Sequence, residues 1–222
     1  MLVLFDIDGT ILLTHGAGVR AMEATMTEFF GAAPARGEVS FAGRLDPLIY
    51  ADLAEASGVV DPDEHHDAFR QRYGEHLAAW FEAGNPATLL PGIATIVETL
   101  ACDERVTIGL VTGNYPETGR LKIDQAGIDS SCFEITAWGT DGAIRRDLPR
   151  VAMERFADRT SREIDPGEVV VIGDTLHDID CARHNGCRSL AVATGGATFD
   201  ELRGDDPDLA VEDLSKTREI LE

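Results

Sequence analysis

The sequence predicts an α/β fold: a doubly wound parallel sheet that carries an inserted all-helical domain. Short, continuously apolar runs recur along the chain, and each ends in small polar or acidic residues, which is typical of strands buried on both faces of a parallel sheet. Stretches with helical periodicity lie between these runs, and strand alternating with helix favours right-handed crossovers. One interval of about 80 residues, between Thr10 and Leu90, contains no strong strand pattern. The four better runs are 2–5, 106–111, 169–172 and 189–193.

Helical patterns connect the predicted strands. Apolar residues repeat at steps of three and four over 93–100, before the second run, and similar patterns cover 151–156 before the third run and 178–185 before the fourth. A weaker strand pattern, at 133–136, lies between the second and third runs. Because ligands of such sheets bind at the carboxyl ends of the strands, we expect the functional residues at that edge.

The long interval after the first strand predicts three helices, at 18–30, 46–57 and 62–83. The third is the clearest, because its large apolar residues fall on one face at steps of three and four. These residues are Phe69, Tyr73, Leu77, Trp80 and Phe81.

These patterns predict two domains within one chain of 222 residues, a length that suits one core domain with a smaller appendage. Residues 1–14 and 86–222 are expected to form a Rossmann-like catalytic core. Residues 15–85 are expected to form a helical cap domain that leaves the core in the loop after the first strand.

The composition excludes some classes of partner. Asp and Glu number 40 against 19 Lys and Arg, and the net charge of −21 repels nucleic-acid polymers and anionic membrane surfaces. No apolar stretch reaches the roughly 18 residues of a membrane span, and the first residues lack the basic segment that begins a signal peptide. The four cysteines are scattered without metal-binding spacing, as in a protein of a reducing compartment. We expect a cytoplasmic protein, monomeric or homodimeric, that acts on a small molecule.

Two acids follow the first strand. Asp6 and Asp8 alternate with Ile7, so in an extended chain their side chains project in the same general direction. Acids also follow the third run, at Asp174 and Asp178, and the carboxyl ends of parallel strands share one edge of a sheet. Like charges gathered so closely need a cation, and oxygen ligands without organised His or Cys suit Mg²⁺. The sequence therefore predicts a Mg²⁺ site made by Asp6, Asp8, Asp174 and Asp178.

A carboxylate beside a metal can act as a nucleophile in phosphoryl transfer. In this arrangement Asp6 attacks phosphorus and forms an aspartyl-phosphate, while Asp8 protonates the leaving oxygen and later activates water. Thr112, at the end of the second run, supplies a hydroxyl to a phosphoryl oxygen, although it can also cap the next helix. One of two adjacent arginines, Arg145 or Arg146, balances the charge.

The order of these motifs resembles that of the haloacid dehalogenase-like superfamily. The resemblance rests on Asp6-Ile7-Asp8-Gly9-Thr10, on Val111-Thr112-Gly113-Asn114, on an arginine ahead of a helix, and on Gly173-Asp174-Thr175-Leu176-His177-Asp178. These motifs occur in order over nearly the whole chain. The helical insert is similar to the C1-type cap of the phosphoglycolate phosphatase-like branch, which implies a cap that closes over the active site and selects the substrate.

The resemblance implies a Mg²⁺-dependent phosphatase that hydrolyses a small phosphomonoester, such as phosphoglycolate, a sugar phosphate or a nucleotide monophosphate, through a phosphoaspartate. Asp8 favours phosphate chemistry over dehalogenation, and Thr10 favours hydrolysis over the reaction of β-phosphoglucomutase-type enzymes. The third motif departs from the usual Lys followed by Pro-x-Pro; we align Arg145 with its basic residue and keep Arg146 as the alternative. A phosphomutase and a non-catalytic phosphate- or partner-binding member stay open as alternative functions.

The remaining predictions concern the substrate. Arg44 can reach the substrate from the helical cap domain. Alternatively, the stretch around Arg44 serves only to start a helix, with Asp46 as the N-cap residue and Pro47 in the first turn. Lys122 is expected to be a surface charge on the helix that follows Thr112. The predicted substrate-binding residues are Gly9, Thr10, Gly113, Asn114, Arg44 and Arg146.

Overall fold

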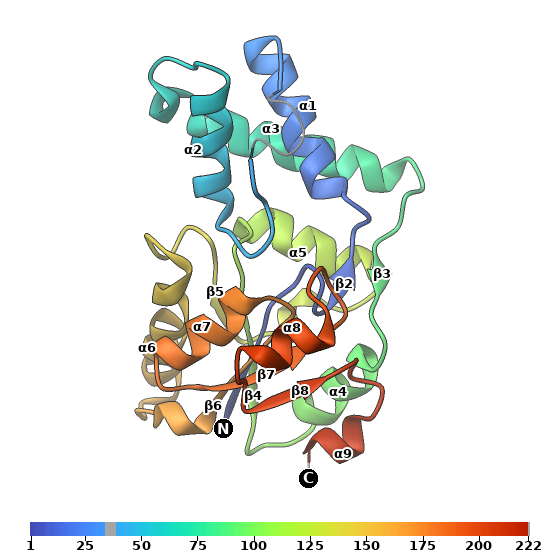
Figure 1. The fold of residues 1–222 in the computed structure, drawn as a ribbon, viewed down its shortest axis with the longest axis vertical. Helices are drawn as coiled ribbons and strands as arrows, with labels where there is room; N and C mark the ends of the chain where they lie inside the picture. The colour runs from blue at the N-terminus through green and yellow to red at the C-terminus, as the bar shows by residue number, and fades with distance from the viewer. Residues whose placement is uncertain (34–38, 222) are drawn as a thin grey trace.

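The computed structural model describes residues 1–33 and 39–221, and its centre is a sheet of six strands (Figure 1). The strand order is β5-β4-β1-β6-β7-β8, and every neighbouring pair is parallel. The five predicted strands are confirmed. β8 was not predicted, because it is a short edge strand without a buried residue and leaves no continuous apolar run. The strands are β1 Leu2–Phe5, β4 Thr107–Val111, β5 Ile135–Ala137, β6 Val169–Gly173, β7 Arg188–Val192 and β8 Leu209–Val211.

Helices cover both faces of this sheet. Val3 and Phe5 of β1 belong to the apolar core that includes α4 and α5, whereas Leu2 and Leu4 belong to the core that includes α6 and α7. Every residue of β1 is therefore buried, which explains its continuously apolar sequence. The doubly wound α/β class is confirmed. The helices are α4 Ile93–Ala101, α5 Pro116–Gln125, α6 Leu148–Thr160, α7 Leu176–His184, α8 Phe199–Gly204 and α9 Thr217–Leu221, with 3₁₀ turns at Ser130–Cys132, Arg145–Asp147 and Pro166–Glu168.

Three further helices lie together beyond the carboxyl end of the sheet: α1 Ala17–Phe30, α2 Asp46–Ala56 and α3 Pro62–Glu82 (Figure 1). They correspond to the three predicted helices, and α1 packs along α3. The predicted apolar face of α3 is buried except for Trp80, which is only partly covered. None of the helices in the described part of the chain is long and apolar enough to cross a membrane.

A small antiparallel ladder joins these helices to the sheet. β2, Leu12–Leu13, pairs with β3, Thr88–Leu89, so the chain leaves the sheet and returns to it at one place. This ladder was not predicted, because two residues in a strand are too few to show a period.

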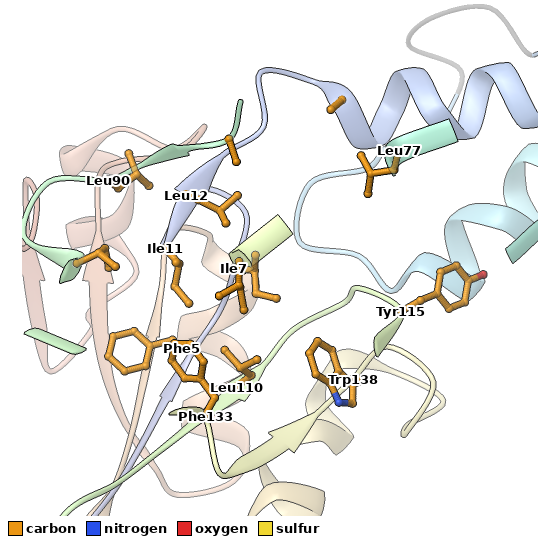
Figure 2. Close-up of a cluster of buried hydrophobic side chains, with 14 of the residues drawn as sticks. Phe5, Ile7, Ile11, Leu12, Leu77, Leu90, Leu110, Tyr115, Phe133 and Trp138 are labelled. Carbon is orange, nitrogen blue, oxygen red and sulfur yellow. The ribbon is translucent and has the colours of Figure 1, made fainter. Parts of the chain in front are cut away.

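One apolar cluster runs from the sheet into the helical insert. Figure 2 shows Phe5 at its base in the sheet, and Leu77 and Tyr115 at the end near the inserted helices. Tyr115 precedes α5 but is fully buried, and its hydroxyl shares a hydrogen bond of 2.7 Å with His66 Nε2 on α3. The guanidinium of Arg70 lies 5.0 Å from the centre of the Tyr115 ring. Tyr115 therefore fixes α3 against the core.

Candidate active site

The carboxyl ends of three neighbouring strands meet at the middle of the sheet. β1 lies between β4 and β6, and the chain winds outward from β1 in both directions. Asp6 directly follows β1, Thr112 follows β4, and Asp174 follows β6; all three residues are buried. Ligands of doubly wound sheets bind at such a switch point. The structure thus brings three of the four motifs together at the edge where the sequence places them.

A tight turn leads the chain away from this edge after β1. Gly9 has a φ of +85°, and a Cβ atom at this position would lie 2.4 Å from Asp174 Oδ2. The Gly9 NH donates to the carbonyl of Leu12 at 2.9 Å, and the Thr10 hydroxyl donates to Asp174 Oδ1 at 3.2 Å. Glycine is required here by both the left-handed backbone and the close approach of Asp174. Thr10 orients that carboxylate.

Asp6, Asp174 and Asp178 form a buried acidic cluster, in which one carboxylate oxygen of each lies within 4.8 Å of the others. Burial, which Arg145 only partly offsets, raises the pKa of Asp6 to about 6. Burial and then repulsion from Asp178 raise the pKa of Asp174 to about 8. Crowded carboxylates without His or Cys are a donor set that fits a hard divalent cation. The side chain of Asp8 lies outside this group of three.

Protons compete with a metal for these oxygens, so we expect Mg²⁺ binding to tighten as the pH rises from about 6 to about 8, the range set by the pKa values of Asp6 and Asp174. At about pH 6 the ion must displace protons from the carboxyl groups in order to bind, whereas at about pH 8 it binds carboxylates that are already ionised. Calorimetric titration with Mg²⁺ in two buffers of different ionisation enthalpy measures both the affinity and the number of protons released. An affinity independent of pH, with no proton release, would contradict a metal site in this cluster.

Of the two adjacent arginines, the structure brings Arg145 to the site. Arg145 is buried, donates to Asp178 Oδ1 at 2.6 Å and lies 3.0 Å from Asp6 Oδ2. Burial opposes its charge, but Asp178 and Asp6 outweigh that effect and raise the pKa of the guanidinium. Its Nε is also buried and has no hydrogen-bond partner among the described residues. Arg146 instead points away, and its exposed side chain makes two hydrogen bonds to Asp180, of 2.6 and 2.7 Å.

A second group of side chains in the site is hydrogen bonded around Asp8. The Asn114 amide donates to Asp8 Oδ2 at 2.9 Å and to the Thr112 hydroxyl oxygen at 2.8 Å. Thr112 does not cap the next helix, because the N-cap of α5 is Tyr115. Lys122 Nζ lies 2.6 Å from Asp8 Oδ2, and the side chain is only 5% exposed. The expectation that Lys122 is a surface charge is therefore wrong.

A cavity of about 380 Å³ opens between this edge of the sheet and the helical insert. Arg44 lines the cavity from the insert, and its guanidinium forms an ion pair with Asp52 of α2. Arg146 does not line the cavity. The other predicted residues that do so are Asp6, Asp8, Gly9, Thr112, Gly113, Asn114, Arg145 and Asp174.

Asp46 joins the helical insert to the loop after β4. Its NH donates to the Gly113 carbonyl at 2.7 Å, and its Oδ2 accepts a hydrogen bond from the Tyr115 NH at 2.9 Å. Asp46 does not cap α2, whose N-cap is Leu45. A Cβ atom at Gly113 would lie 1.9 Å from the carbonyl oxygen of Arg44, so glycine permits this contact between core and insert. Burial raises the pKa of Asp46 to about 7.

We expect Asp46→Asn to stabilise the protein increasingly as the pH rises. Because the pKa of Asp46 is raised from 3.8 to about 7, the folded parent keeps a proton that the unfolded chain loses. The free energy of unfolding of the parent therefore decreases as the pH rises from about 3.8 to about 7. The variant has no such carboxyl group, so the difference in the free energy of unfolding between variant and parent grows by about 4 kcal/mol at most over this range. Urea unfolding from about pH 5 to about pH 8 measures the difference. Asp158→Asn, at an exposed position of α6, serves as the control; an equal pH profile for both variants would contradict the prediction.

The loop after β7 also supports the site, although its residues were not among those predicted. The Thr194 hydroxyl donates to the Gly9 carbonyl at 2.6 Å. A Cβ atom at Gly195 would lie 1.7 Å from Asp174 Oδ2, so this glycine lets the loop pass beside the acidic cluster. The signal was present in the sequence, because the fourth apolar run also ends in small polar residues.

A doubly wound sheet with a buried acidic cluster and an arginine at its switch point, next to inserted helices, has the arrangement of an α/β enzyme whose ligand binds at the carboxyl ends of the strands. Residues 3–192 match the family model described as haloacid dehalogenase-like hydrolase, and the chain belongs to this family. The predicted family is confirmed, and the protein is a hydrolase.

Named relatives cover nearly the whole chain. Pyrophosphatase PpaX of Bacillus pumilus is 23% identical over 215 residues, which cover 96% of this chain and 92% of the relative. Phosphoglycolate phosphatase of Vibrio vulnificus is 22% identical over 233 residues, covering 99% and 95%. These relatives support the phosphoglycolate phosphatase-like branch and the activity of a phosphoric monoester hydrolase.

Solved structures confirm the fold. A hydrolase from Pseudomonas syringae has a TM-score of 0.74 with 20% identity, covering 99% of this chain and 96% of that one. A β-phosphoglucomutase from Clostridium difficile has a TM-score of 0.70 with 15% identity, covering 100% and 99%.

Proposed function

We propose that this protein is a Mg²⁺-dependent phosphatase that hydrolyses a small phosphomonoester through a phosphoaspartate formed on Asp6. The observation that carries the proposal is the position of Asp6, a buried carboxylate at the switch point, 3.0 Å from Arg145 and within the acidic cluster. A carboxylate can attack a phosphate ester only where nearby positive charge neutralises the approaching oxygens. Family membership and the phosphatase relatives support the same activity.

Asp6, Asp174 and Asp178 would hold the Mg²⁺. When bound, the ion neutralises charge on the phosphoryl group and fixes its orientation. Arg145 adds a second positive charge, and its buried Nε has an N–H that a phosphoryl oxygen can accept. The Thr112 hydroxyl, held by Asn114, is a further donor beside Asp6.

The reaction has two steps. Asp6 attacks phosphorus, the bond to the ester oxygen breaks, and Asp8 donates a proton to that oxygen, so that a neutral alcohol leaves. Asp8, now ionised, accepts a proton from a water molecule whose oxygen attacks the phosphoaspartate. Phosphate is released, Asp6 is again a carboxylate, and Asp8 has regained its proton. The Asp8 side chain contacts Asn114 and Lys122 and lies outside the acidic cluster, so the residue that moves the proton is separate from the carboxylates that would hold the metal.

The helical insert, residues 15–85, acts in this proposal as a cap on a catalytic core made of residues 1–14 and 86–222. The substrate is a small phosphorylated metabolite, enclosed by the cavity of about 380 Å³. Gly9, Gly113, Asn114 and Arg44 line this cavity and are assigned to substrate binding. The cytoplasmic location stays a prediction from the sequence, and both a monomer and a homodimer stay open.

A panel of phosphorylated compounds tests the proposal. Phosphate release is measured from phosphoglycolate, sugar phosphates, nucleotide monophosphates, pyrophosphate and p-nitrophenyl phosphate, with Mg²⁺ and with a chelator. We expect release from at least one monoester, and only when the metal is present. Isomerisation of a hexose phosphate without net phosphate release would indicate a phosphomutase. Phosphate binding without turnover of any compound would indicate a non-catalytic member.

A further inference from the structure

Lys122 is a buried cation to which the mechanism above assigns no role of its own. It lies on α5 and is 4% exposed, and its Nζ lies 2.6 Å from both Asp8 Oδ2 and Asn114 Oδ1. Burying an ammonium group is unfavourable unless it is paired and hydrogen bonded, so these two contacts hold Lys122 in one place. A Cβ atom at Gly18 of α1 would lie 3.5 Å from Nζ, which shows that the helical insert covers the lysine.

The contacts distinguish the two oxygens of Asp8. Oδ2 accepts hydrogen bonds from Lys122 at 2.6 Å and from the Asn114 amide at 2.9 Å. Oδ1 has no hydrogen bond to any described residue. The Asp8 side chain is 41% exposed and lines the cavity, so Oδ1 is the oxygen that a ligand can reach.

We propose that Lys122 is a positioning residue for proton transfer by Asp8. Together with Asn114 it fixes Oδ2, so that Oδ1 faces the leaving oxygen of the substrate. This inference rests on the proposed phosphatase activity. It separates Lys122 from Arg145: Arg145 serves the carboxylate that attacks, and Lys122 serves the carboxylate that moves the proton.

Leaving-group chemistry tests this role. The ratio kcat/KM reports substrate binding and cleavage of the ester bond but not the later hydrolysis of the phosphoaspartate, so the comparison of leaving groups reveals the protonation of the leaving oxygen. An alkyl alcohol needs that proton, whereas p-nitrophenolate leaves without one. We expect Lys122→Met to lower kcat/KM for the best alkyl phosphate of the panel on the order of 10²-fold, and to lower it only a few-fold for p-nitrophenyl phosphate.

A double-mutant cycle tests whether Lys122 acts through Asp8. Asp8→Asn is expected to show the same dependence on the leaving group, and Asp8→Asn with Lys122→Met is expected to be no slower than Asp8→Asn alone. Arg120→Met is the matched control, because Arg120 lies on the same helix but its guanidinium carbon lies over the Trp138 ring, 5.2 Å from the ring centre. If Lys122→Met does not fold, Lys122→Gln, which keeps a polar group at this position, replaces it in the experiment. Circular dichroism verifies that each variant is folded.

Three results would overturn the inference while leaving the phosphatase activity of the parent intact. These are an equal loss on alkyl and aryl substrates, a loss that adds to that of Asp8→Asn, and a rise in KM without a change in kcat. The last would make Lys122 a substrate-binding residue. Failure of the proposed function is recognised separately, because the parent protein then releases no phosphate from any compound.

Discussion

Asp6→Asn is expected to lower kcat by at least about 10⁴-fold for every phosphomonoester that the parent hydrolyses. The amide group of Asn has nearly the shape of the carboxyl group but cannot form the phosphoaspartate. Asp6 lies 3.0 Å from Arg145 and is 7% exposed at its side chain, so no water molecule can take its place without rearrangement. Steady-state assays with the best substrate and Mg²⁺ measure the loss.

The same substitution is expected to leave the fold intact. It removes a buried acid whose pKa is already raised to about 6, and it creates no cavity. Thermal unfolding should therefore show a change of only a few degrees. Asp158→Asn controls for the loss of one charge, and intact-protein mass spectrometry excludes deamidation of Asn back to Asp. A variant that hydrolyses as fast as the parent would show that Asp6 is not the nucleophile.

The convergence of Asp6, Thr112 and Asp174 was predictable from the sequence. Each follows a continuously apolar run, and parallel strands present their carboxyl ends at a single edge. The full order of the strands was not needed for this prediction, because it is enough that the three runs are parallel neighbours, as β4, β1 and β6 are. The position of each polar residue at the end of an apolar run therefore carried most of the information about this part of the site.

Lys122 and Asp46 show where this reasoning ends. Lys122 is one cation on a helix that the sequence places at the surface, and the inserted helices, with Gly18 of α1 against the ammonium, help to bury it. Asp46 precedes Pro47 as a helix cap would, but its carboxylate accepts a hydrogen bond from Tyr115 in the core. Both roles arise from contact between the insert and the core, which no local pattern records. β2 and β3 were missed for a different reason, since each has only two residues.

Arg145→Met and Arg146→Met are expected to differ sharply although the residues are adjacent. Arg145 is 9% exposed and contacts both Asp6 and Asp178, so its loss leaves buried carboxylates without a counter-charge. We expect a fall of about 3 kcal/mol in the free energy of unfolding and a loss of turnover of at least about 10²-fold. Arg146 is 48% exposed in its pair with Asp180, and its loss is expected to change the free energy of unfolding by less than about 1 kcal/mol.

The destabilisation by Arg145→Met should increase with pH. Arg145 lowers the pKa of Asp6 in the folded protein, so this pKa is higher in Arg145→Met than in the parent. In the unfolded chain the pKa of Asp6 is 3.8, so above this pH the unfolded chain releases a proton that the folded variant keeps. The free energy of unfolding of the variant therefore decreases as the pH rises towards the raised pKa of Asp6 in the folded variant. Mg²⁺ is expected to restore part of the stability, because it supplies positive charge to the same carboxylates. Urea unfolding of both variants at about pH 5.5 and about pH 8, with and without Mg²⁺, measures these effects. If Arg146→Met proves the more damaging, Arg146 and not Arg145 fills the third motif.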